Sequence, residues 1–169
     1  MRTTLLFLTF LLSYHTQAQP FFSLAPQSHY SSSTKKIIKA DTGKYFVVST
    51  EGGTNTKYAR TLYCIDTTGA ILFTKPLFTQ STMSGFSINA LTTTSDGNFI
   101  CAGNGTFCDV GGDTTYIEKF DLQGNSIWEK AFGLTTQYES PTCIAELSNG
   151  NFIVGRYNNL LTIDHNGDS

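Results

Sequence analysis

Residues 120–132 read FDLQGNSIWEKAF and hold two carboxylates, two amides, a glycine and the only tryptophan of the chain. Asp121, Gln123 and Asn125 stand at alternate positions in this stretch, a spacing that suits oxygen ligands of a metal or a sugar. The same residue types also build turns between two strands. Comparison with the rest of the chain decides between these two interpretations. The same comparison also indicates the fold.

An internal repeat runs through most of the chain. A short polar turn with a glycine, then an aromatic residue and β-prone residues, occurs as DTGKYFVV (41–48), SDGNFICAG (95–103) and SNGNFIVGR (148–156). The aligned glycines Gly43, Gly97 and Gly150 are separated by 97 − 43 = 54 and 150 − 97 = 53 positions. A fixed period near fifty residues indicates a repeat architecture.

A second motif, D-x-x-G, follows the first in each copy. Its aspartate and glycine are Asp66 and Gly69, Asp121 and Gly124, and Asp164 and Gly167. Aspartate opens such a turn by hydrogen bonding its own backbone, and glycine takes the positive φ that the hairpin needs. The first copy has Thr68 and Ala70 where the second has Gln123 and Asn125, so the amides are not retained. The stretch 120–132 is therefore predicted to be a turn between strands.

The third copy, DHNGD, places Asp164, Asn166 and Asp168 at alternate positions, like the start of a calcium loop. The later glycine and the distal glutamate of that pattern do not follow within the sequence. The turn is again the favoured interpretation, and no metal site is expected.

Each repeat resolves into four short strands by its alternating pattern. In the middle copy these are SINALTTT, NFICAG, TTYIEKF and SIWEKAF. Four antiparallel strands at this period describe one blade of a β-propeller. The predicted fold is all-β, with about two and three-quarter blades: 33–79, 80–133 and an incomplete 134–169. A β-sandwich is the alternative, but it gives no reason for the same turn to recur in register.

The N-terminus is predicted to be a secretory signal peptide over residues 1–18. Arg2 supplies the positive charge, LLFLTFLL (5–12) the apolar core, and TQA (16–18) the cleavage site. Residues 19–32 are then an N-terminal strand or linker. The apolar run is far shorter than a membrane span, so we expect a secreted protein, periplasmic or extracellular, without membrane insertion.

The charge pattern of the chain argues against a nucleic-acid partner. The net charge is −2, and the only basic run is the pair Lys35 and Lys36. A nucleic-acid-binding surface needs a basic face, so no nucleic-acid partner is expected.

Four cysteines, Cys64, Cys101, Cys108 and Cys143, allow three pairings, of which Cys101–Cys108 across a glycine-rich loop is a possible disulfide. Cys64 and Cys143 lie in apolar runs, where a free thiol behaves as a small hydrophobe.

The middle repeat resembles the blades of secreted bacterial β-propellers of Bacteroidota-like, uncharacterised type. Those blades follow a D-G-[GN]-[YF]-I hairpin with a strand that ends K-x-D-x-x-G-x-x-x-W-x-K. Asp96, Gly97, Phe99, Ile100, Lys119, Asp121, Gly124, Trp128 and Lys130 match that pattern. In the first copy Phe73 replaces the tryptophan. The resemblance implies a propeller used for binding or display, and a chain that is a fragment of a longer propeller.

Catalytic residues have little support in the sequence. Outside the expected signal peptide only His29 and His165 remain, with no nucleophile–base arrangement around them. Glu118 and Glu129 alternate with apolar residues, which predicts a solvated strand face, and no acidic pair is expected on one face. We expect a non-catalytic module without cofactor. The alternative is the N-terminal part of a secreted propeller enzyme acting on glycans.

Binding residues are expected at one end of the propeller, where connections between strands two and three and between blades gather. The candidates there are Tyr58, Phe107, Asp109, Asp113 and Tyr138. Aromatic and carboxylate side chains suit a glycan or a protein ligand of unknown identity. Two and three-quarter blades do not close a ring, so the expected partners also include the remaining blades of a longer chain, or self-association through open edge strands.

Overall fold

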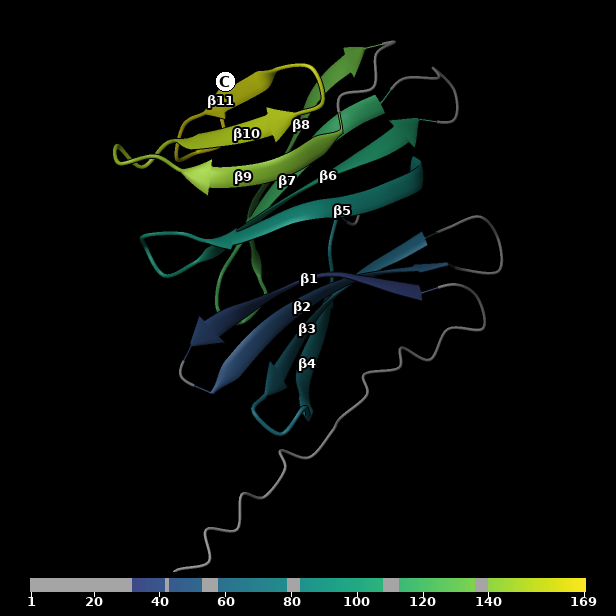
Figure 1. Cartoon of the computed structure of the whole chain (residues 1–169), viewed down its shortest axis with the longest axis vertical. Helices are drawn as coiled ribbons and strands as arrows, with labels where there is room; N and C mark the ends of the chain where they lie inside the picture. Colours follow the sequence, from purple (N-terminus) through teal and green to yellow (C-terminus); the bar gives the residue numbers. More distant parts are fainter. Residues whose placement is uncertain (1–31, 42, 53–57, 79–82, 108–112, 136–139) are drawn as a thin grey trace, which may run out of the picture.

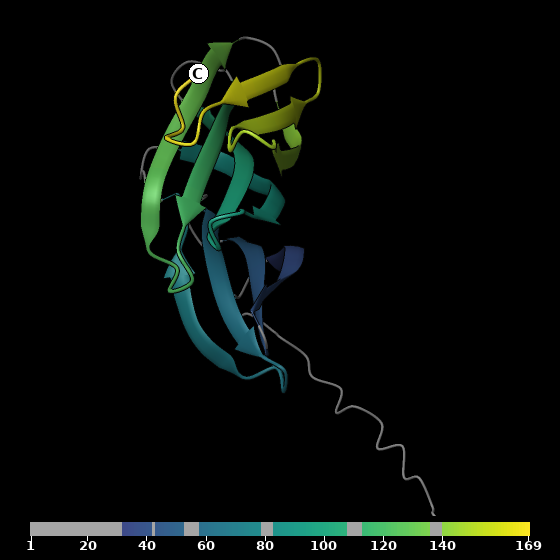
Figure 2. The same ribbon diagram turned by 90° about the vertical axis from the view of Figure 1, so that its left-hand side faces the viewer.

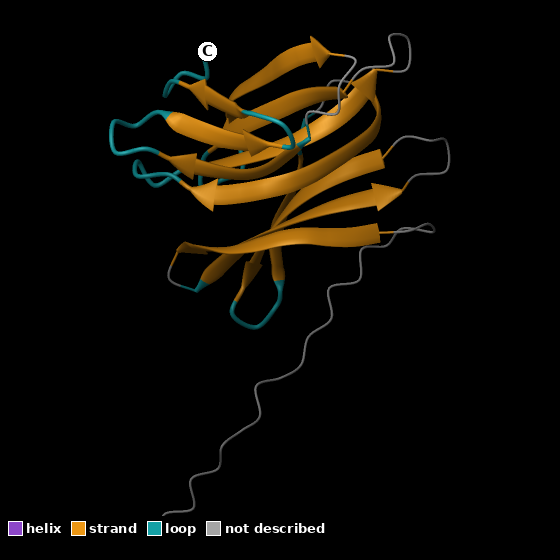
Figure 3. Ribbon diagram, turned by 45° about the horizontal axis from the view of Figure 1, so that its top comes forward, coloured by secondary structure: helices purple, strands orange, loops and turns teal. Residues whose placement is uncertain are grey.

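The computed structural model describes residues 32–41, 43–52, 58–78, 83–107, 113–135 and 140–169. Every regular element in these ranges is a β-strand, so the chain is all-β, as predicted (Figure 3). No helix with the length and apolar character of a membrane span occurs in the described ranges. The predicted signal peptide and the linker before Ser32 lie outside them.

The strands form three antiparallel sheets that follow one another along the chain (Figure 1). Sheet 1 contains β1 (Ser32–Asp41), β2 (Lys44–Gly52), β3 (Tyr58–Asp66) and β4 (Ile71–Pro76). Sheet 2 contains β5 (Met83–Thr93), β6 (Phe99–Phe107), β7 (Asp113–Phe120) and β8 (Ser126–Thr135). Sheet 3 contains β9 (Pro141–Glu146), β10 (Phe152–Arg156) and β11 (Leu160–Ile163). In each sheet the strands pair in chain order, so one sheet corresponds to one sequence repeat.

The D-x-x-G motif forms the same turn in all three sheets. Oδ1 of Asp121 accepts hydrogen bonds from the backbone N–H groups of Gln123 (2.9 Å) and Asn125 (2.8 Å), and Gly124 has φ 74°. Asp66 and Asp164 make the corresponding bonds, to residues two and four positions later. These bonds confirm the turn predicted for residues 120–132.

The sheets stack face to face, and their inner faces make two apolar cores. Sheets 1 and 2 share a core around Phe46, Phe99 and Phe120, with the Phe46 and Phe99 rings 4.3 Å apart in an edge-on arrangement. Sheets 2 and 3 share a core around Ile100, Ile117, Phe152 and Val154. Sheet 2 is therefore covered on both faces, which decides where its polar side chains lie.

The connections divide between two ends of the stack. At one end, here the turn end, tight glycine turns join strands one and two of each sheet and strands three and four of sheets 1 and 2, and the turn at residues 164–167 follows β11. At the other, here the loop end, lie the strand ends that flank residues 53–57, 79–82, 108–112 and 136–139, on one side of Figure 1. The short β10–β11 connection, residues 157–159, also lies at the loop end. Figure 2 shows the first strands of the sheets along one side, with β4 and β8 along the other.

Candidate functional site

The structure brings the backbones of three predicted binding residues to the loop end. Tyr58 begins β3 opposite Gly52, Phe107 ends β6, and Asp113 begins β7 opposite Thr106. Only the backbones of Tyr58, Phe107 and Asp113 are described. The two other candidates, Asp109 and Tyr138, lie outside the described residues. The positions of these three strand ends agree with the expectation that the connections beside them lie at one end of the molecule. The binding role of the residues stays a prediction.

Tyr157 is an exposed aromatic residue at the loop end that the sequence analysis missed. Its side chain is 76% exposed, the largest value among the exposed large hydrophobic residues of the described chain. Its backbone is held in place, because its N–H donates to the carbonyl oxygen of Ser140 at 3.2 Å. Beside it, Nε of Arg156 donates to Oδ1 of Asn159 at 2.6 Å. An exposed ring on a fixed backbone, next to an Arg–Asn pair, suits contact with a ligand.

A pair of carboxylates lies across two strands of sheet 2. Glu118 on β7 is the direct cross-strand partner of Glu129 on β8. Glu118 is only 4% exposed, and Oε1 of Glu129 is buried with no hydrogen-bond partner among the described residues. The expectation of a solvated strand face is therefore wrong for Glu118, and the two carboxylates meet across two strands rather than along one. Because sheet 2 is covered on both faces, alternation with apolar residues does not indicate solvent here.

Burial changes the acidity of both carboxyl groups. It raises the pKa of Glu118 to about 7, although a hydrogen bond from the Phe78 N–H opposes the rise. Burial also raises the pKa of Glu129, while the nearby charge of Arg60 lowers it. Near neutral pH a fraction of Glu118 therefore retains a proton that an exposed glutamate would have lost.

Phe78 connects the carboxylate pair to the chain between sheets 1 and 2. Its N–H donates to Oε2 of Glu118 at 3.1 Å, and its carbonyl oxygen accepts from Nη1 of Arg60 at 3.3 Å. Its φ of 51° is in the left-handed region, which costs a residue with a side chain free energy. Gly133 follows Gly124 by nine positions, as Phe78 follows Gly69, and it also has a positive φ, 73°. Phe78 in the first repeat thus has the positive φ that Gly133 has in the second. Burial of the Phe78 ring and its hydrogen bonds with Glu118 and Arg60 stabilise this conformation.

At the turn end the second and third D-x-x-G turns each pack on the fourth strand of the preceding sheet. A Cβ atom added to Gly124 would lie 2.9 Å from Cε2 of Phe73 and 2.9 Å from Cγ of Lys75. One added to Gly167 would lie 3.0 Å from Cε3 of Trp128 and 3.0 Å from Cγ of Lys130. We call each of these contacts, of a turn glycine with an aromatic residue and a lysine two positions later, a clasp.

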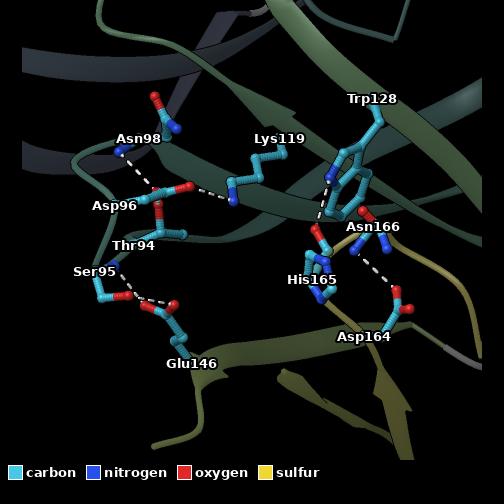
Figure 4. A network of polar contacts seen from close by, with 10 residues as sticks. All are labelled: Thr94, Ser95, Asp96, Asn98, Lys119, Trp128, Glu146, Asp164, His165 and Asn166. Carbon is cyan, nitrogen blue, oxygen red and sulfur yellow. Dashed lines mark hydrogen bonds and ion pairs between the residues drawn. The ribbon is translucent and has the colours of Figure 1, made fainter. Parts of the chain in front are cut away.

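Polar bonds complete both clasps. Nζ of Lys75 donates to Oδ1 of Asn125 at 3.3 Å, and Nζ of Lys130 lies 2.7 Å from Oδ1 of Asp168. The indole Nε1 of Trp128 donates to the carbonyl oxygen of His165 at 3.2 Å (Figure 4). Two of the residues that the sequence alone offered as metal or sugar ligands, Asn125 and Asp168, thus serve contacts between repeats, while Asp121 and Asp164 bond within their own turns.

A second polar network joins sheets 2 and 3 beside the clasp (Figure 4). Nζ of Lys119 lies 2.7 Å from Oδ2 of Asp96 and 5.5 Å from the centre of the Phe152 ring. Burial alone would raise the pKa of Asp96, but hydrogen bonds from Lys119, Thr94 and Asn98 lower it below its ordinary value. The carboxylate of Glu146 accepts from the N–H and hydroxyl of Ser95, which ties β9 to the turn after β5.

The remaining candidates concern thiols and metals. Cys101 is a fully buried free thiol, and Cys108 lies outside the described residues, so the predicted disulfide stays a prediction. Cys64 is buried, as expected, whereas Cys143 is exposed on β9, on the face that sheet 3 turns away from sheet 2. No group of three or more His, Cys, Asp or Glu side chains in the described ranges is arranged to hold a metal ion.

No protein-family model matches the chain, and no curated protein matches it. The chain is similar to the crystal structure of a protein of unknown function from Bacteroides caccae. That similarity has a TM-score of 0.54 at 16% sequence identity, and it covers 81% of this chain and 44% of that one. The chain thus spans less than half the length of its structural neighbour. At this identity the likeness concerns the fold alone.

Proposed function

We propose that this protein is a secreted, non-catalytic binding or scaffolding module of β-propeller type. The proposal rests on a difference between the two ends of the stack of sheets. At the turn end, polar side chains are engaged in repeated contacts between sheets, which makes a rigid stack. At the loop end, the strand ends carry the variable connections and the exposed Tyr157. Rigid sheets that present loops at one end are a common basis for ligand binding.

The observation that carries the proposal is the exposure of Tyr157 on a fixed backbone. A ring that is 76% exposed gains contact area when a ligand covers it, and little conformational entropy is lost because its backbone is already held. Aromatic rings suit the apolar faces of sugars, and neighbouring Arg156 and Asn159 provide polar groups. A glycan is therefore the first ligand class to test.

The test is affinity electrophoresis of the protein in gels that contain soluble β-1,3-glucan, xylan or galactomannan. We expect retardation by at least one polysaccharide and roughly tenfold weaker retardation for Tyr157→Ala. Leu147→Ala is the matched control, because Leu147 is also exposed on sheet 3 but lies at the turn end. Equal loss in both variants, or no retardation by any polysaccharide, contradicts a glycan site at Tyr157.

The alternative function, a propeller enzyme acting on glycans, draws on the Glu118–Glu129 pair. Two carboxyl groups with raised pKa values are the kind of groups that glycoside hydrolysis uses. However, Glu118 is buried between sheets and engaged with the backbone of Phe78, which favours a structural role. Measuring reducing ends after incubation with the same polysaccharides separates the functions, since their release would overturn the non-catalytic proposal.

Secretion is a separate part of the proposal and has its own test. Expression of the full chain in a bacterial host, followed by N-terminal sequencing of the exported protein, should show a product that starts at Gln19. A product that retains Met1 and stays in the cytoplasm would contradict it.

A further inference from the structure

Glu118 and Glu129 lie opposite each other on neighbouring strands of sheet 2. They are direct cross-strand partners on β7 and β8, and such partners have Cβ atoms about 4.5–5.5 Å apart on one face of the sheet. Tyr116 and Phe120, two positions to either side of Glu118, belong to the core between sheets 1 and 2. Alternation therefore turns both glutamates toward that boundary, where their carboxyl groups are within reach of each other.

The donors around the two carboxyl groups are unevenly distributed. Oε2 of Glu118 accepts a hydrogen bond from the Phe78 N–H at 3.1 Å, and Ser126 also bonds to this group. Oε1 of Glu129 is buried, and within the described ranges no donor reaches it. A buried acceptor without a donor costs free energy. A proton on Glu118 would supply the missing donor from the directly opposite residue.

The charges near the pair also favour one proton. Burial disfavours the ionised form of both carboxyl groups, and Arg60 on β3 is the positive charge that acts on Glu129. The other titratable groups that act on them are Tyr116 on β7 and Cys101 on β6, and burial raises the pKa of both, so both are neutral at pH 7. One proton on the pair therefore leaves one negative charge to balance Arg60, whereas two ionised carboxylates leave an uncompensated charge.

We propose that Glu118 and Glu129 share one proton in the folded protein, with the carboxyl group of Glu118 as the donor and Oε1 of Glu129 as the acceptor. Glu118 keeps the proton because it is the more deeply buried of the two, and burial raises its pKa to about 7. Glu129 keeps the negative charge because Arg60 opposes the rise in its pKa. The proposal concerns the boundary between sheets 1 and 2, and it does not depend on the ligand proposed for the loop end.

Release of the shared proton leaves two like charges facing each other across β7 and β8. The Phe78 N–H holds Glu118, whereas Glu129 lies on the edge strand of sheet 2 and is only half-buried. Glu129 is therefore the side chain that turns toward water, and Arg60 then loses its counter-charge at the boundary between sheets 1 and 2. The pair is thus a pH-sensitive contact, which is closed while one proton is bound and opens as that proton leaves.

The experiment is an NMR titration of the whole protein between pH 4 and pH 9, with ¹³C at the Cδ carbon of its glutamates and ¹⁵N throughout. We expect the Cδ signals of Glu118 and Glu129 and the amide signal of Phe78 to shift in one common step near pH 7. A Glu129 signal that stays constant through the step of Glu118 overturns the proposal. This measurement needs no variant, so it does not depend on how a substitution folds.

Two variants separate a shared proton from burial alone. Glu129→Gln removes the neighbouring negative charge, so it should lower the proton affinity of Glu118 about tenfold, and a change of less than about threefold overturns the proposal. In Glu118→Gln the amide N–H donates to Oε1 of Glu129 in place of the proton, so the Glu129 signal should show no step near pH 7, and a step there also overturns the proposal. Glu146→Gln is the matched control, because the Glu146 carboxylate bonds to Ser95 at the boundary between sheets 2 and 3, and it should leave the common step unchanged.

Discussion

Nζ of Lys130 on β8 and Oδ1 of Asp168 lie 2.7 Å apart, although 38 residues separate them in the sequence. The pair closes the clasp between sheets 2 and 3, next to Trp128 and Gly167. In sheets 1 and 2 the corresponding atoms belong to Lys75 and Asn125. One small set of contacts thus joins successive repeats, and its members can be tested one at a time.

The first prediction concerns the close approach at the turn glycine. Gly124→Ala should lower the free energy of unfolding by about 3 kcal/mol, because the new methyl group meets Phe73 and Lys75 and the backbone has a positive φ. Gly97→Ala is the control, since Gly97 has φ 80° with nothing within 4 Å of an added Cβ, and it should cost only about 1 kcal/mol. Urea unfolding followed by far-ultraviolet circular dichroism, which reports the strands of all three sheets, measures both. Equal losses would mean that the clasp is not tightly packed.

The second prediction separates two lysine–aspartate pairs by burial. Lys119→Met should cost about 2 kcal/mol, because the Lys119 side chain is 8% exposed and also lies over the Phe152 ring. Lys130→Met should cost less than about 1 kcal/mol, because both members of its pair are exposed. The contribution of Lys130 should also shrink in 0.5 M NaCl, whereas that of Lys119 should not. Unfolding at two salt concentrations tests the contrast, and a reversed order would contradict it.

The third prediction concerns pH. The pKa of Glu118 is raised from its ordinary value of 4.5 to about 7, so folding favours its protonated form. The associated stability is fully present below pH 4.5 and is lost as the pH rises through 7, by on the order of 3 kcal/mol. Urea midpoints should therefore fall between pH 5 and pH 8.

Glu118→Gln is the control for this pH dependence. The amide oxygen still accepts from the Phe78 N–H, but the side chain no longer titrates, so the fall between pH 5 and pH 8 should be smaller in the variant. Ser126, Glu129 and Cys101, which interact with this carboxyl group, stay unchanged. An identical fall in both proteins would assign the pH dependence to another group.

The fourth prediction concerns the thiols. Cys143 is exposed and should react with iodoacetamide in the folded protein, whereas Cys64 and Cys101 are fully buried and should react only after unfolding. Burial also raises the pKa of Cys101 well above its ordinary value, which reduces the reactive thiolate. Peptide mapping without reductant also tests the pairing predicted from the sequence: labelling of Cys101 after unfolding would contradict a disulfide with Cys108, and its absence would support one.

The sequence predicts those features that are local to one repeat. The turns at Asp66, Asp121 and Asp164 follow from aspartate and glycine at a fixed spacing, because the bonds that define them span at most four residues. The four strands of sheet 2 follow from alternation between such turns. The residues of the clasps could be recognised as repeated, but not as partners, because the bonded residues are 50 positions apart in the first clasp and 37 or 38 positions apart in the second.

The buried carboxylates show where pattern alone misleads. Strand alternation places Glu118 on the face opposite Ile117 and Lys119, and a glutamate there indicates solvent only when that face of the sheet meets water. Sheet 2 is covered on both sides, and a register shift between Lys119 and Phe120 sets Glu118 opposite Glu129. Conversely, Cys143 lies in an apolar run but on a face of sheet 3 that no described element covers.

Each described sheet is joined mainly to its neighbour in the sequence, so the molecule behaves as a short one-dimensional array. In such an array, the folding free energy is the sum of the intrinsic free energy of each sheet and the interaction free energy of each boundary between sheets. Neighbouring sheets unfold together only when the boundary between them is strongly stabilising. Trp128 lies at the boundary between sheets 2 and 3, so its fluorescence reports the separation of that boundary. A mutation that loosens the first clasp would then leave this signal in place while hydrogen exchange already shows sheet 1 fraying.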